Sequence, residues 1–259
     1  MLLAAAAILP LLAEVSAPPT MEQTKLAVCI DQANKNPTTA IITASGWLGE
    51  ATGAARALPQ QCIGVADTLL QRWKPAEQAF LDGRGYADPK DYELRARLAA
   101  MAGNAALADG RHADALADLD LALADAKTAS DNNVAGGIQL DRARALVALG
   151  RMDEAKSALA EARSDTPQDS EAWLLSATLA RRENDLATAS TQIATAAGLA
   201  PRDPAIALEA GVISELSGNE EAARKSWESA IAVAPKSPEA ATAKSYLDQI
   251  GPAAQDKGQ

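Results

Sequence analysis

Aromatic residues are scarce in this sequence of 259 residues: they make up 3% of it, and only one of them is phenylalanine. The apolar residues, 48% of the chain, are instead largely alanine and leucine. Both are strong helix formers, and alanine lets helices pack at short distance. With 22% charged residues, the balance is that of a folded chain rather than a disordered one. The composition therefore predicts an all-α fold.

Basic residues are outnumbered by acidic ones, which gives the chain a formal net charge of −10. The paired arginines at 95 and 97, at 142 and 144, and at 181 and 182 are separated by acidic stretches, so they form no basic patch. A negative chain repels nucleic-acid phosphates and anionic membrane surfaces. We therefore expect neither a nucleic acid nor a membrane surface as the partner.

Histidine is also rare, and the single one, His112, is expected to be a surface residue at the start of a helix. General acid-base and nucleophilic catalysis usually need a histidine or an activated cysteine. Asp114 and Asp118 lie four residues apart on one helix face, opposite the predicted core, and are expected to face solvent. Motifs for zinc, calcium or phosphate binding are missing from the sequence. We therefore predict that the chain is not an enzyme and holds no cofactor or metal ion.

A long apolar run of about 20 residues, which a membrane-spanning helix needs, is absent, but the first 13 residues are almost all leucine, alanine and isoleucine. Small residues follow at Val15, Ser16 and Ala17. This pattern predicts a signal peptide over residues 1–17 and a periplasmic or secreted protein with no membrane segment in its mature chain. No basic residue precedes the apolar run, and the alternative is an N-terminal helix of a cytoplasmic protein.

The two cysteines, Cys29 and Cys62, fit export, because an even count in an exported chain favours a disulfide. Closing a loop of about 33 residues would stabilise the fold by roughly 3 to 4 kcal/mol if the stabilisation comes from chain entropy. In a cytoplasmic chain the pair would instead be two buried free thiols.

What the sequence does contain is a repeat, marked by three prolines that stand 34 residues apart: Pro167, Pro201 and Pro235. Before each proline, the same kinds of residue recur at the same offsets. A small residue is followed seven positions later by a residue suited to a left-handed turn, and 16 positions later by a large apolar residue. The small residues are Ala143, Ala177 and Gly211; the turn residues are Gly150, Asn184 and Gly218; the large residues are Leu159, Ile193 and Trp227.

This pattern resembles the tetratricopeptide repeat, a family whose 34-residue unit is a pair of antiparallel helices. The resemblance implies that the small residues lie where the two helices of a pair cross, since a bulky side chain there would wedge them apart. It covers about Pro59 to Ile250 and includes an upstream unit with Gly103, Gly110 and Leu119. A weaker match follows Cys62, where Gln71 stands at the turn.

The resemblance implies a right-handed superhelical solenoid of antiparallel helix pairs, with an N-terminal helical cap and a C-terminal capping helix. A divergent first repeat spans 59–90, and six residues are inserted between the second and third repeats, over Lys127 to Asn133. Short helices at Glu22–Ala33 and Thr38–Leu48 would form the N-terminal cap, pinned by the disulfide. The predicted divisions are the cap at 18–58, repeats at 59–90, 96–129, 136–169, 170–203 and 204–237, the capping helix at 238–250 and a tail at 251–259.

In this family, the first helices of the pairs line a concave groove in which ligands lie, so the groove residues follow from helical spacing. They are Arg97, Asn104, Leu140, Arg144, Leu174, Thr178, Arg181, Leu208, Val212 and Glu215. The leucines recur every 34 residues and would form an apolar stripe, while Arg144 and Arg181 could bind carboxylates. Alternatively, the leucines pack between neighbouring repeats and the arginines pair with nearby acids.

We therefore predict a scaffold in the cell envelope that binds a protein or an extended peptide on its concave face. A self-assembling structural or accessory subunit of an envelope complex is the alternative, and an enzyme is less favoured. The sequence does not indicate the oligomeric state.

Overall fold

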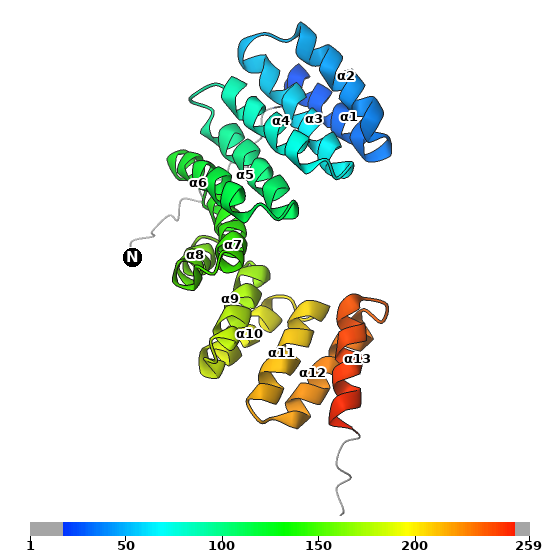
Figure 1. The fold of residues 1–259 in the computed structure, drawn as a ribbon, viewed down its shortest axis with the longest axis vertical. Helices are drawn as coiled ribbons and strands as arrows, with labels where there is room; N and C mark the ends of the chain where they lie inside the picture. The colour runs from blue at the N-terminus through cyan, green and yellow to red at the C-terminus, as the bar shows by residue number, and fades with distance from the viewer. Residues whose placement is uncertain (1–17, 252–259) are drawn as a thin grey trace, which may run out of the picture.

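A computed structural model describes residues 18–251 of the chain. The predicted signal peptide, 1–17, and all but the first residue of the predicted tail lie outside the described residues. Over the described range the chain forms thirteen α-helices and one short 3₁₀ helix, with no strand. Figure 1 shows them as a curved stack of helical hairpins, with α1 at one end and α13 at the other. The predicted all-α solenoid is thus confirmed.

Successive helices pair in chain order, with α3/α4, α5/α6, α7/α8, α9/α10 and α11/α12 as the hairpins of the repeats. The elements are α1 (Met21–Lys35), α2 (Pro37–Glu50), η1 (Gly53–Arg56), α3 (Ala57–Leu69), α4 (Trp73–Tyr86), α5 (Tyr92–Ala108), α6 (His112–Ala129), α7 (Asn132–Ala148), α8 (Met152–Asp165), α9 (Ser170–Arg182), α10 (Leu186–Leu199), α11 (Pro204–Leu216), α12 (Glu220–Val233) and α13 (Pro238–Ile250). None of these helices is both long and apolar enough to cross a bilayer.

The turn inside each repeat has the left-handed conformation that the sequence predicts. The φ angle is 72° at Gly110, 75° at Gly150, 77° at Gly218 and 63° at Asn184. Gln71 in the divergent first repeat also adopts this conformation, with φ of 56°. The residue after each turn donates a backbone hydrogen bond to the carbonyl five positions earlier, which satisfies a carbonyl at the helix end. The geometry of the turn is therefore the same in all five hairpins, whether or not glycine is present.

The crossing of the two helices in a repeat is made by a small residue and a large residue 16 positions later. A Cβ atom added to Gly103 would lie 2.6 Å from the Leu119 side chain, and one added to Gly211 would come closer than 3.0 Å to Trp227. Real Cβ atoms essentially never approach so closely. Small residues at these crossings are therefore required by the approach of the helices, as predicted.

The six inserted residues lengthen two helices. Helix α6 has 18 residues and α7 has 17, whereas their counterparts α10 and α11 have 14 and 13. The link between α6 and α7 is only Ser130 and Asp131, against the four residues 200–203 between α10 and α11. The insertion is thus absorbed as four additional residues on each helix, with a shorter link between them.

The N-terminal cap is a hairpin of α1 and α2 joined to α3 by a disulfide. Thr20 and Gln23 form a capping box that starts α1, and the Asn36 side chain accepts a hydrogen bond from Thr39 N to start α2. Cys29 and Cys62 form the predicted disulfide, with their Cα atoms 6.1 Å apart, and both residues are buried. At the other end, α13 packs Tyr246 against Trp227, with ring centroids 5.2 Å apart. Its outer residues are exposed: Ala241, Lys244, Ser245 and Asp248.

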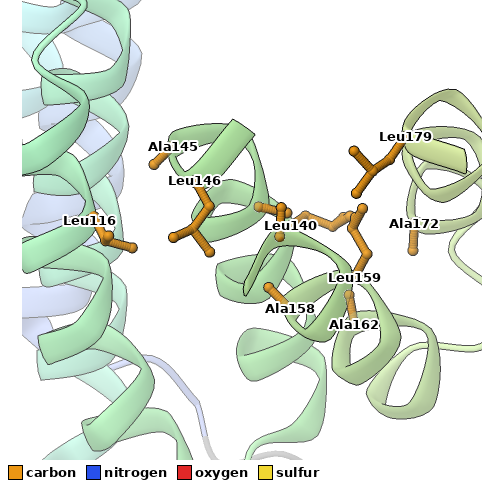
Figure 2. Packing of buried hydrophobic residues seen from close by; sticks show 11 residues of the cluster. Leu116, Leu140, Ala145, Leu146, Ala158, Leu159, Ala162, Ala172 and Leu179 are labelled. Atoms are coloured by element: carbon orange, nitrogen blue, oxygen red, sulfur yellow. The ribbon is translucent and has the colours of Figure 1, made fainter. Parts of the chain in front are cut away.

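The core is a row of small clusters, each shared by neighbouring hairpins, rather than one centre. Figure 2 shows the cluster at the middle of the stack, where Leu140 and Leu159 meet Leu179 of α9. This cluster joins the hairpin α7/α8 to the hairpin α9/α10. The candidate site lies directly beside it.

Candidate functional site

First helices of neighbouring hairpins contact each other at two joints, with α5 beside α7 and α9 beside α11. Helices α7 and α9 hardly touch. A cavity of about 220 Å³ opens between them. Its walls come almost entirely from these two first helices. The residues that line it are Ala143, Arg144, Val147, Leu159, Leu175, Thr178, Leu179 and Arg182.

Most of this cavity is apolar, and guanidinium groups stand at its edge. Arg144 forms ion pairs with Asp141 on its own helix and with Glu171 on α9. Arg182, the last residue of α9, is exposed and forms no ion pair with any residue in the described range 18–251. The cavity can therefore accept an apolar group while offering one cation, Arg182, to an anion.

The ten predicted groove residues are distributed along the solenoid and do not form one continuous site. Only Arg144 and Thr178 line the cavity between α7 and α9. Val212 and Glu215 line a second cavity, of about 270 Å³, between α11 and α13. Arg97 lines a third, of about 430 Å³, with residues of α1, η1 and α3. Asn104 is exposed on α5.

The remaining predicted groove residues pack within the solenoid. Leu140 is buried in the central cluster, at 4% exposure, and Leu174 and Leu208 are half-buried against the clusters of the next hairpins. Arg181 Nε donates to Glu209 Oε1 of α11 over 2.6 Å. These contacts match the alternative that the leucines pack between repeats and that the arginines pair with nearby acids.

Reasoning from the sequence missed Arg182, Val147 and Leu175 as cavity residues. One signal was available: Arg182 follows Thr178 by four residues, so both lie on one face of α9. Arg181 is one position away, which is about 100° around the helix, and it therefore points toward α11 instead.

Asp118 corrects the expectation of a solvated acidic face on α6. Asp114 is exposed, as expected, and pairs with Arg111 over 2.9 Å. Asp118 is only 7% exposed, and Glu77 of α4 is close enough to it to affect its pKa. Burial and the neighbouring carboxylate of Glu77 raise the pKa of Asp118 to about 6. Even so, no group of three or more potential ligands for a metal ion occurs among the described residues.

This buried carboxyl predicts a pH-dependent stability. Because its pKa is about 6 in the folded chain and 3.8 ordinarily, the folded state holds the proton more tightly. Stability is therefore lost as the pH rises from about 4 to 6, and the loss is complete above pH 6. Replacing Asp118 with asparagine should raise the free energy of unfolding at pH 7.5 by about 1 to 3 kcal/mol, and the gain should shrink toward pH 4.

Urea unfolding followed by circular dichroism at the two pH values measures this difference. Asp114→Asn, on the same helix but exposed, is the matched control and should not show the gain. A gain for Asp118→Asn that is equal at pH 4 and pH 7.5 would contradict the assignment.

Antiparallel hairpins, left-handed turns and small residues at the crossings together define a helical-repeat solenoid. The family model of the tetratricopeptide repeat matches residues 106–179, from the end of α5 into α9. Residues 106–179 therefore belong to tetratricopeptide repeats, and the described helices on both sides of them continue the same solenoid fold that the sequence predicts. Proteins of this kind are in general scaffolds for interactions between proteins.

Solved structures of other repeat proteins have the same fold. PilW, described as a widely conserved type IV pilus biogenesis factor, aligns with a TM-score of 0.69 and 17% identity over 87% of this chain and 99% of its own. PilF of Pseudomonas aeruginosa aligns with a TM-score of 0.66 and 12% identity over 88% of this chain and 100% of its own. YrrB, described as having an unusual peptide-binding site, aligns with a TM-score of 0.53 and 21% identity over 73% of this chain and 92% of its own. No curated protein sequence matches this chain significantly.

Proposed function

We propose that this protein is an interaction scaffold of the cell envelope that holds an extended peptide or protein segment along the concave side of its solenoid. The observation that carries the proposal is the largely apolar cavity between α7 and α9, first helices of two neighbouring hairpins, which Arg144 and Arg182 also line. YrrB, which shares the fold, is described as having a peptide-binding site. The partner is accordingly a protein or peptide, and binding it requires neither catalysis nor a cofactor.

Placement in the envelope rests on two features of the chain. The apolar first 13 residues have the character of a signal peptide. The buried disulfide between Cys29 and Cys62 is a bond that persists in oxidising compartments and is rare in the cytosol. PilW, which is similar in fold, is described as a pilus biogenesis factor, and this agrees with a role in the cell envelope.

Site-specific photo-crosslinking tests which side of the solenoid binds. A photoreactive residue would be placed at Asn104 or Thr178 on the first helices, and at Ser157 or Ser190 on the second helices as matched controls. All four variants are incubated with an envelope extract, and crosslinked proteins are identified by mass spectrometry. Crosslinks from the first pair but not from the second support the proposal. Crosslinks confined to the second pair would place the binding surface elsewhere.

A second candidate function, self-assembly, is favoured by the outer face of the N-terminal hairpin. A cavity of about 590 Å³ lies between α1 and α2, and two residues that line it are largely exposed, Met21 at 74% and Val28 at 64%. If this face binds a second copy, light scattering should show an oligomer that Val28→Asp converts to a monomer. A mass that stays monomeric at all concentrations removes this candidate.

A further inference from the structure

We infer that the cavity between α7 and α9 is a subsite for one large apolar side chain that has an aspartate or glutamate as its neighbour in the bound segment. This inference rests on the proposed function, because it specifies which kind of segment the scaffold holds. It follows from the size of the cavity, from the charges at its edge and from its place in the solenoid.

The size of the cavity fits one side chain. Its volume, about 220 Å³, is below the range of about 300 to 1,000 Å³ that is typical of sites for whole small molecules. Val147 of α7 and Leu175 of α9 line it from the two helices, and Leu159 of α8 also contributes. Apart from the Thr178 hydroxyl and the two arginine side chains, the lining is apolar, so a leucine, methionine or phenylalanine side chain fits it best.

The charges at the edge select the neighbour of that side chain. The guanidinium of Arg144 is already occupied by Asp141 and Glu171. The acid next to Arg182, Glu183, is paired with Lys156 over 2.7 Å. Arg182 is thus the charge at this edge that remains available within the described structure, and guanidinium groups bind carboxylates in bidentate fashion. An acidic neighbour is favoured, and a lysine or arginine neighbour is repelled.

The place of the cavity indicates an internal segment of the ligand rather than a chain end. First helices continue on both sides of it, α5 beyond α7 and α11 beyond α9. A bound chain can therefore pass over the cavity in both directions. The carboxylate that reaches Arg182 then comes from an aspartate or glutamate side chain.

Three peptides with acetylated and amidated ends test the subsite, because blocked ends remove the terminal carboxylate. Their sequences are Gly-Ser-Asp-Leu-Asp-Ser-Gly, the same peptide with Leu replaced by Ala, and the same peptide with both Asp residues replaced by Lys. Each is titrated to millimolar concentration into the full chain labelled at its methyl groups for NMR. We expect the first peptide to shift the methyl signals of Val147, Leu175 and Leu179, and the other two to bind about tenfold more weakly.

Charge reversal at the edge completes the test. In Arg182→Glu the preference should invert, so that the lysine peptide binds more tightly than the aspartate peptide. Arg202→Glu, an exposed arginine outside the cavity, is the matched control and should keep the original order. Equal binding of all three peptides, shifts confined to other methyl groups, or no shift with the aspartate peptide would each overturn the subsite. If crosslinks from Asn104 and Thr178 persist in that case, the proposed scaffold function stands without it.

Discussion

Replacing Leu159 with alanine is expected to lower the free energy of unfolding by about 2 to 5 kcal/mol, the range for large-to-small changes in a core. Leu159 is 2% exposed and packs in the central cluster with Leu140 and Leu179 (Figure 2). It also stands 16 positions after Ala143, as the large residue of its helix crossing. One side chain therefore stabilises both a hairpin and the joint to the next hairpin.

The upper part of that range is expected because the site cannot collapse easily. Leu159 and Leu179 line the cavity of about 220 Å³ between α7 and α9, and also a cavity of about 360 Å³ that includes residues of α8, α9 and α10. Truncating Leu159 would enlarge the two cavities and connect them, because neighbouring side chains would not fill the space that it leaves. Because contacts in a solenoid are made mainly between adjacent repeats, the hairpins on either side of this joint should then unfold less cooperatively.

Urea unfolding followed by circular dichroism measures both effects, as a lower midpoint and a broader transition. Leu121→Ala is the matched control, since Leu121 is 43% exposed on α6, and its stability should change by no more than about 0.5 kcal/mol. If Leu159→Ala behaves like this control, the joint between α8 and α9 is held by other contacts.

The sequence predicts the hairpins well because their signals are local. A left-handed turn needs glycine or asparagine within one short segment, and a close crossing needs a small residue at a fixed offset from a large one. Gln71 shows where this reasoning is weakest, since its side chain does not favour the left-handed conformation that the turn nevertheless imposes. The helices on either side of this turn still cross at a small and a large residue, Gly64 and Phe80.

The candidate site is less predictable because it depends on how hairpins meet. Asp118 is buried, and its carboxylate neighbour Glu77 comes from α4, a helix whose position relative to α6 no local pattern specifies. The cavity between α7 and α9 exists because these two helices stand apart, whereas the pattern of small residues is the same in their repeats as in the next one. Arg181 and Arg182 show that one residue in helical phase is enough to separate a side chain that pairs with a neighbouring helix from one that lines the cavity.

Removing the disulfide by Cys29→Ala and Cys62→Ala together is expected to lower the free energy of unfolding by roughly 3 to 4 kcal/mol, from the entropy of the chain that the bond closes. The effect should be concentrated in α1 and α2. The cluster between this hairpin and α3 consists of the two cysteines and four alanines, Ala33, Ala40, Ala44 and Ala66, with partly buried apolar residues around them. Alanine buries little apolar surface, so the bond contributes a large share of the attachment.

Hydrogen exchange of backbone amides tests where the stability is lost. Because the contacts of a solenoid are mainly between neighbouring hairpins, the loss should stay near the disulfide. In the double variant, amides of α1 and α2 should exchange much faster than in the native chain, while those of α7 to α12 keep their protection. The native chain treated with a reducing agent is the matched control and should behave like the variant, which itself should not respond to the reducing agent. Unchanged protection of α1 and α2 in both samples would mean that side-chain packing alone holds the N-terminal hairpin in place.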